Sequence, residues 1–176
     1  MTAQFREKLY YKGYELLMCT TPLASYLAKS GKSPEFGSLC TACWRGYTGT
    51  WEIDRGRLFL IGLKGYLKNG ALLTMSSLFP RQPRVFASWY SGDLRIPRGK
   101  MLKNIHMGFA SMYEEELIFT IESGKMRKIW ICRGSEKDEP VEGNQHEQIM
   151  AALAEGQPQK KRRGSSRVEQ LLTPGH

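Results

Sequence analysis

The sequence predicts a mainly β fold, with an α+β arrangement as the alternative: an antiparallel sheet, a sandwich or a small barrel with one N-terminal helix and a disordered C-terminal tail. Short apolar runs of strand length alternate with glycine-containing turns, one segment has clear helix start and stop signals, and the last forty residues lack aromatic side chains. Several short strands with one helix are typical of a sheet-based domain. We place a single β-rich globular domain at residues 1–134 and the tail at residues 135–176.

The first two predicted elements have strong local signals. Leu9–Met18 is expected to form a hairpin that turns at Lys12–Gly13, because glycine adopts the positive φ that such turns need. The helix is expected at Pro22–Ser30, with Thr21 as its N-cap, proline at its first position and Gly31 just after its end.

A second hairpin is centred on Asp54–Arg57, with the strand Tyr47–Ile53 before it and the strand Leu58–Leu63 after it. No fixed-period repeat is visible, which argues against a solenoid or a propeller. Further strands are predicted at Val85–Ile96, Met101–Met107, Glu116–Glu122 and Met126–Arg133, the last two joined through Ser123–Gly124.

Charge is distributed unevenly along the chain. Residues 1–134 contain 20 Lys and Arg against 10 Asp and Glu, a net charge of +10. Residues 135–157 have a net charge of −5 and residues 158–176 a net charge of +4. Charged segments without aromatic residues bury too little apolar surface to offset the entropy of ordering, so residues 135–176 are expected to be disordered and dispensable for folding.

The sequence predicts a cytoplasmic protein without a membrane partner. The N-terminus lacks the apolar segment of a secretion signal, and the longest uncharged stretch, Asn69–Pro80, is too short to span a bilayer. In a reducing compartment the cysteines are expected to be thiols.

Cys40 and Cys43 have the two-residue spacing of a zinc or redox pair. A zinc site would need two further ligands from Cys19, Cys132 and His106, and the sequence has no second close pair. We therefore predict ordinary buried cysteines, no metal and no cofactor.

Four motifs carry a resemblance to a family of uncharacterised bacterial proteins: WRGY at 44–47, WEI at 51–53, SGDLRIP at 91–97 and HMG at 106–108. Some proteins of that family are associated with plasmids and other mobile elements. The resemblance spans about residues 8–130 and implies a bacterial single-domain protein. It implies no catalytic residue.

The leading functional prediction is a non-enzymatic protein that binds a polyanion, namely nucleic acid. Cationic side chains neutralise phosphates, and exposed aromatic side chains can stack on bases. In the alternative interpretation the aromatics fill the core and the charges solvate the outer face, as strand alternation produces. The candidate binding residues are Arg81, Arg84, Arg95, Arg98, Lys100 and Lys103, with Lys160, Lys161, Arg162 and Arg163 in the tail.

The alternative prediction is a small enzyme. Its candidate catalytic residues are Arg45, His106, Glu114 and Glu116. With the stretch Thr74–Ser77, the order of arginine, serine and glutamates resembles that of Arg–Ser–Glu mono-ADP-ribosyltransferases, in which arginine and serine help to bind NAD and glutamate acts in transfer.

Phosphate-loop, Gly-x-Ser-x-Gly and His-Glu-x-x-His motifs are absent from the sequence. A Cys–His nucleophile made from Cys43 or Cys132 with His106 stays open, because such pairs meet in space rather than in sequence. A protein–protein interaction module is a third alternative, since an exposed apolar patch has no sequence signature. The sequence does not decide between these functions.

Overall fold

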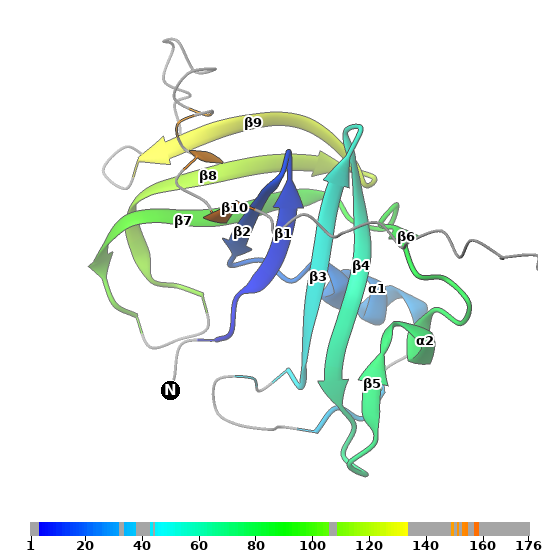
Figure 1. Ribbon diagram of the computed structural model, residues 1–176. Helices are drawn as coiled ribbons and strands as arrows, with labels where there is room; N and C mark the ends of the chain where they lie inside the picture. Colours follow the sequence, from blue (N-terminus) through cyan, green and yellow to red (C-terminus); the bar gives the residue numbers. More distant parts are fainter. Residues whose placement is uncertain are drawn as a thin grey trace, which may run out of the picture.

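The computed structural model describes residues 4–31, 34–37, 43, 45–105, 109–133, 149, 151, 153–154 and 157–158. Its centre is a mixed, largely antiparallel sheet with the strand order β10-β2-β1-β3-β4-β9-β8-β7, and β5 and β6 pair with β4 (Figure 1). This confirms the predicted mainly β class with an N-terminal helix. Within these residues no helix has the length and apolar character to cross a membrane.

The elements follow one another along the chain with short connections. They are β1 (Glu7–Tyr11), β2 (Tyr14–Met18), α1 (Pro22–Ser30), β3 (Tyr47–Asp54), β4 (Arg57–Tyr66), β5 (Leu72–Thr74), α2 (Met75–Leu78), β6 (Val85–Phe86), β7 (Gly92–Lys103), β8 (Met112–Glu122), β9 (Lys125–Arg133) and β10 (Gln157–Pro158).

The local turn signals place the first elements correctly. Lys12 and Gly13 both have positive φ, at 46° and 83°, and join β1 to β2. The helix α1 has its predicted bounds and ends at Gly31, which is left-handed with φ 64°. Thr21 precedes it without a side-chain cap hydrogen bond, so the helix start rests on Pro22 and on the bond from Ala24 N to Thr21 O.

The strands β1 and β3 pair in parallel, whereas the sequence predicted an antiparallel sheet. The hairpin β1–β2 reverses the chain, α1 follows, and β3 then runs beside β1 in the same direction (Figure 1). The β3–β4 hairpin around Asp54–Arg57 is confirmed, with Arg55 and Gly56 in the turn at positive φ.

The predicted strand Val85–Ile96 is wrong, because the chain turns after Phe86. Ala87 N donates to Leu58 O, and Tyr90 N donates to Ala87 O, which folds 87–90 into a turn between β6 and β7. The strand then resumes at Gly92 and runs to Lys103, so it absorbs the first part of the predicted strand Met101–Met107.

The strand β5 and the helix α2 were not predicted from the sequence. The short helix α2 begins with a capping box in which Thr74 N donates to Ser77 Oγ at 3.0 Å. The usual capping box has Ser or Thr at the N-cap and Glu or Gln three positions later. Here Ser77 stands at the later position, so the sequence signal for this helix is weak. The serine-bearing stretch of the enzyme hypothesis therefore caps this helix.

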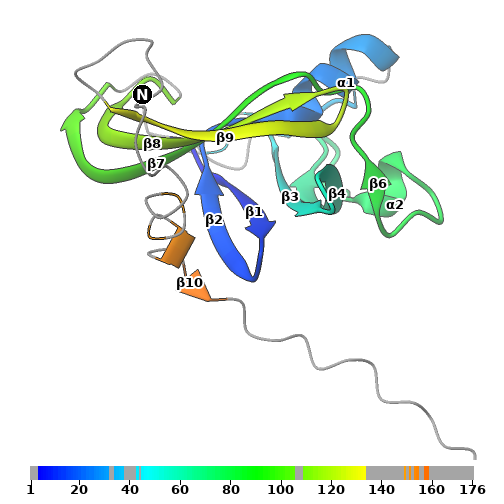
Figure 2. The ribbon, with the colours of Figure 1, turned by 90° about the horizontal axis from the view of Figure 1, so that it is seen from above.

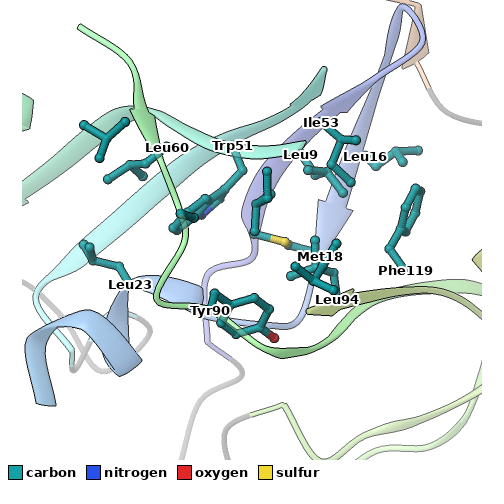
Figure 3. Close-up of a cluster of buried hydrophobic side chains, with 14 of the residues drawn as sticks. Leu9, Leu16, Met18, Leu23, Trp51, Ile53, Leu60, Tyr90, Leu94 and Phe119 are labelled. Atoms are coloured by element: carbon teal, nitrogen blue, oxygen red, sulfur yellow. The ribbon is translucent and has the colours of Figure 1, made fainter. Parts of the chain in front are cut away.

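The sheet curls until β7 meets the end of β2. Cys19 N donates to Arg95 O at 2.8 Å, and Arg95 N donates to Thr20 Oγ1 at 3.0 Å. Figure 2 shows β7, β8 and β9 lying across one end of β1 to β4. The curl encloses the core, where buried Trp51 and Phe119 face one another across Leu9, Met18 and Leu94 (Figure 3).

Most of residues 135–176 lie outside the described part of the chain, and the boundary at residue 134 stays a prediction. The expectation that nothing beyond it joins the core is corrected at two places. Leu153 is only 1% exposed and belongs to the core cluster, with Ile149 packed against it. The backbone of β10 pairs with β2 at Glu15 and Tyr14.

Candidate nucleic-acid interface

Arg45, the first candidate catalytic residue, lies just before β3 and is bound to a buried carboxylate. Its Nη2 is 3.5 Å from Glu7 Oε1 and donates to the Phe5 carbonyl at 2.8 Å. The Glu7 side chain on β1 is fully buried. Because Arg45 links the segment before β1 to the start of β3, this ion pair fixes two strands that are distant in sequence.

The other Glu7 oxygen is held by Trp51, whose Nε1 donates to Oε2 at 2.6 Å. Burial raises the pKa of Glu7 above its ordinary 4.5, and the bonds from Trp51, the Arg45 charge and the Gly49 backbone oppose this rise. Gly49 leaves the space that this contact needs, since a Cβ there would lie 2.6 Å from Trp51 Nε1.

The Arg45 guanidinium lies beside two aromatic rings, with Cζ 5.7 Å from the Tyr47 centroid and 5.7 Å from the Phe109 centroid. The pKa of Tyr47 is raised above its ordinary value, mainly by burial and to a smaller extent by the charge of Glu7. The buried Cys43 thiol contacts the Tyr47 carbonyl at 3.6 Å. These contacts give Arg45 a structural role in the packing of this corner of the sheet.

The candidate glutamates on β8 have other partners. Glu116 accepts two hydrogen bonds from Arg95, at 3.0 and 2.6 Å, and this hydrogen bonding raises the pKa of Arg95. Glu114 accepts from Lys100 N at 2.9 Å. No contact described for these residues joins Arg45 to either glutamate, and His106 lies outside the described residues. The predicted catalytic set therefore stays a prediction, and the described contacts give Arg45, Glu114 and Glu116 separate partners.

Among the residues that the structure describes, no three His, Cys, Asp or Glu side chains gather as metal ligands. Cys43 is described and Cys40 is not, so their spacing stays a sequence observation. Cys19, Cys43 and Cys132 form no disulfide within the described part of the chain.

The predicted nucleic-acid-binding residues fall into different surroundings. Arg95 is paired with Glu116, and Arg98 Nη1 is 3.4 Å from Glu115 Oε2. Lys100 and Lys103 are exposed at the end of β7, whereas Arg81 is exposed between α2 and β6 on the other side of the molecule (Figure 1). The tail residues Lys160, Lys161, Arg162 and Arg163 lie outside the described part of the chain.

Arg84 belongs to a group that the sequence analysis did not assemble. Phe59 on β4 and Phe86 on β6 are cross-strand partners, with their ring centroids 5.7 Å apart. Arg84 Cζ lies 3.7 Å from the Phe59 centroid, and Arg57 Cζ lies 5.8 Å from the Phe86 centroid. We call these four residues, Arg57, Phe59, Arg84 and Phe86, the arginine–aromatic strip.

The strip lies on the outer face of the sheet. Leu58 and Leu60 on either side of Phe59 are fully buried, so strand alternation directs Phe59 away from the core. Figure 1 shows α1 behind β3 and β4, and Leu23 of α1 belongs to the core cluster together with Leu58 and Leu60. Both phenylalanines are half-buried rather than enclosed.

Charge around the strip is mixed, with a cationic excess at one end. Arg84 Nη2 is 3.0 Å from both Glu52 Oε2 and Asp54 Oδ2. Arg55 and Lys125 are exposed near Arg57, which faces Lys125 across the strands β4 and β9. No ion pair is described for Arg55, Arg57 or Lys125, so their charges are available to a ligand.

The fold and this surface define a mainly β protein with a solvent-facing strip of arginines and aromatics. No family model matches the chain. No curated protein and no solved structure matches it either. The resemblance to bacterial proteins of mobile elements stays a prediction.

Proposed function

We propose that the protein is a non-enzymatic nucleic-acid-binding protein that contacts its partner through the arginine–aromatic strip and the adjacent Arg55 and Lys125. The observation that carries this proposal is the Phe59–Phe86 pair on the outer face of the sheet, with one guanidinium group beside each ring. Arginine supplies phosphate contacts, and a half-exposed aromatic ring supplies a surface for a base.

The charge balance supports this proposal. The first 134 residues have a net charge of +10. Several acidic side chains are already engaged, as Glu122 is with Arg127 and Glu52 and Asp54 are with Arg84. The remaining positive field attracts polyanions over a distance and raises their association rate.

Two other features agree with a nucleic-acid partner. The resemblance to proteins of plasmids and mobile elements favours a protein that works beside DNA or RNA. The basic run Lys160–Arg163 adds a second, sequence-independent source of phosphate contacts. Because this run contributes to binding by the full chain, the experiment has to separate it from the strip.

The test is a titration of the full chain against fluorescently labelled single-stranded and double-stranded oligonucleotides at two salt concentrations. We expect weak binding without strong sequence preference, and affinity that falls steeply as salt rises. The double variant Arg57→Gln/Lys125→Gln should weaken binding about tenfold and make the salt slope shallower by about one unit for each phosphate that the variant no longer neutralises.

Lys68→Gln is the matched control, because Lys68 is exposed beyond the far end of β4. A variant with Lys160, Lys161, Arg162 and Arg163 all changed to Gln measures the contribution of the tail. Failure of every oligonucleotide to bind at low salt would contradict the proposal. It would also be contradicted if the Arg57→Gln/Lys125→Gln variant bound as tightly as the Lys68→Gln control.

A further inference from the structure

The arginine–aromatic strip has the geometry of a stacking surface. Phe59 and Phe86 are neighbours across two strands, with their ring centroids 5.7 Å apart and their ring planes inclined by 53° on the same face of the sheet. Cross-strand neighbours are held by the backbone ladder, so the two rings keep their spacing when a ligand arrives. Because the two rings are inclined to one another, each would stack on a separate base.

We infer that the ligand class is single-stranded nucleic acid, whose bases stack on Phe59 and Phe86 while its phosphates contact Arg57 and Arg84. This inference rests on the proposed function and adds the kind of nucleic acid to it. In a duplex the faces of the bases are covered by their stacked neighbours. A single strand exposes those faces, so aromatic platforms favour it.

In the free protein the charge of Arg84 is paired with two carboxylates of the protein itself. The Arg84 guanidinium covers the Phe59 ring at 3.7 Å, while Glu52 and Asp54 each lie 3.0 Å from Nη2. The two carboxylates occupy the places that phosphate oxygens would take. The three charged side chains are all partly exposed, with 37–46% of each accessible, so the arrangement can exchange for a ligand's phosphate.

Arg57 has no ion pair among the described residues, and its cross-strand partner Asp54 is bound to Arg84. The Arg57 guanidinium lies 5.8 Å from the Phe86 centroid, and the structure describes no carboxylate bound to it. The end of the strip at Arg57 is thus open to a phosphate from the start. We expect a strand to engage Arg57 and Phe86 first and to displace Arg84 from its carboxylates as the second base reaches Phe59.

The test uses the full chain and compares a labelled oligothymidylate with a duplex of equal length. Phe59→Leu and Phe86→Leu keep apolar side chains on the sheet but remove the aromatic faces. Each should weaken single-strand binding about tenfold while changing duplex binding less than about twofold. Phe5→Leu is the matched control, because Phe5 is 53% exposed and lies outside the strip.

Phe59→Tyr separates stacking from folding, since it retains an aromatic ring, and it should bind single strands within about twofold of the wild type. If Phe59→Leu and Phe86→Leu bind single strands normally while Arg57→Gln/Lys125→Gln weakens binding, the stacking inference is overturned and the proposed function stands. If Phe59→Tyr weakens binding as much as Phe59→Leu does, the inference is also overturned. If no nucleic acid binds, both proposals fall.

Discussion

Glu7 shows how one buried charge organises a corner of this fold. A carboxylate removed from water is costly unless it is paired and hydrogen-bonded. Glu7 receives the Trp51 N–H on one oxygen and the Arg45 charge near the other. That second oxygen, with Nε and Nη1 of Arg45, has no hydrogen-bond partner among the described residues. The pairing is therefore incomplete, and the ionised form of Glu7 stays costly.

Replacement of Glu7 by Gln should change how stability depends on pH. Burial raises the Glu7 pKa above 4.5 in the folded protein, so its stabilising contribution is complete below 4.5 and is lost as pH rises through the folded-state pKa. Gln does not titrate. The free energy of unfolding of the wild type minus that of Glu7→Gln should therefore fall as pH rises from about 4 to 7.

Urea denaturation at several pH values measures this difference. Glu122→Gln provides the control, since Glu122 is exposed and its partner Arg127 is also at the surface. A difference between wild type and Glu7→Gln that rises with pH would show that the folded protein favours the ionised carboxylate. A constant difference would show that folding leaves the Glu7 pKa unchanged, and either result contradicts the prediction.

Gly49→Ala should destabilise the same corner. The added Cβ would lie 2.6 Å from Trp51 Nε1 and 2.8 Å from Glu7 Oε2, and both groups are buried. Such overpacking costs about 1–3 kcal/mol of the free energy of unfolding. Gly62→Ala is the control on the neighbouring strand, where the nearest atom would be Thr50 Cβ at 3.1 Å. Equal denaturation midpoints for the two variants would refute this account of Gly49.

At the scale of elements, the strip depends on the register of β3, β4 and β6. Glu52 faces Phe59, which in turn faces Phe86, so three strands contribute neighbouring positions to one row. Arg84 reaches this row from the residue before β6 and is shared between Phe59 and the carboxylates. A one-residue slip of β6 would move Phe86 to the other face and dismantle the row.

Removal of the carboxylates should strengthen ligand binding. The variant Glu52→Gln/Asp54→Asn frees Arg84 and lowers the negative charge near the strip, so affinity for a single strand should rise about two- to tenfold. In the Arg84→Gln background the same pair of changes should raise affinity less. There is no Arg84 charge to release in that background, so only the loss of negative charge near the strip contributes. The double-mutant cycle, measured by fluorescence anisotropy, isolates the competition for Arg84. Equal gains in both backgrounds would mean that no such competition exists.

The elements that could be predicted are those with a local signal. The turns at Lys12–Gly13, Asp54–Arg57 and Ser123–Gly124 depend on backbone conformations that their own residues favour, and the helix α1 is bounded by proline and glycine. The parallel pairing of β1 with β3 and the turn after Phe86 depend on contacts between distant segments, such as Ala87 N with Leu58 O. No local pattern contains that information.

The candidate site was predictable only in part. The sequence indicated Arg84 as a binding residue and aromatic side chains among the basic residues. Phe59 and Arg57 were not predicted, although alternation around buried Leu58 and Leu60 placed both on the outer face. The order of residues in the sequence grouped Arg45 with Glu114 and Glu116. In the structure Arg45 pairs with Glu7, whose burial has no signal in the sequence.

At the scale of the whole molecule, the core draws on residues from both ends of the described chain. Leu9 on β1 and Leu153 near the end are 0% and 1% exposed and belong to one cluster. The backbone of β10 adds to the sheet beside β2. Part of the segment expected to be dispensable therefore supports the fold.

Leu153→Ala should lower the free energy of unfolding by about 2–5 kcal/mol, because it removes a buried side chain and leaves a cavity. Truncation after Gly134 should cost at least as much. Leu72→Ala is the control, since Leu72 is 54% exposed and should cost less than about 1 kcal/mol. If Leu153→Ala and the truncated chain both melt within a few degrees of the wild type, the original expectation of a dispensable tail holds.

The central claim is that nucleic acid binds to the outer face of β4 and β6, and photochemical crosslinking tests it most directly. The full chain would be irradiated with a single-stranded oligonucleotide, digested and analysed by mass spectrometry for nucleotide adducts. The account predicts adducts on the peptides that contain Phe59 and Phe86, reduced in Arg57→Gln/Lys125→Gln and unchanged in Lys68→Gln. Adducts confined to the end of β7 or to Lys160–Arg163, or no adducts at all, would contradict it.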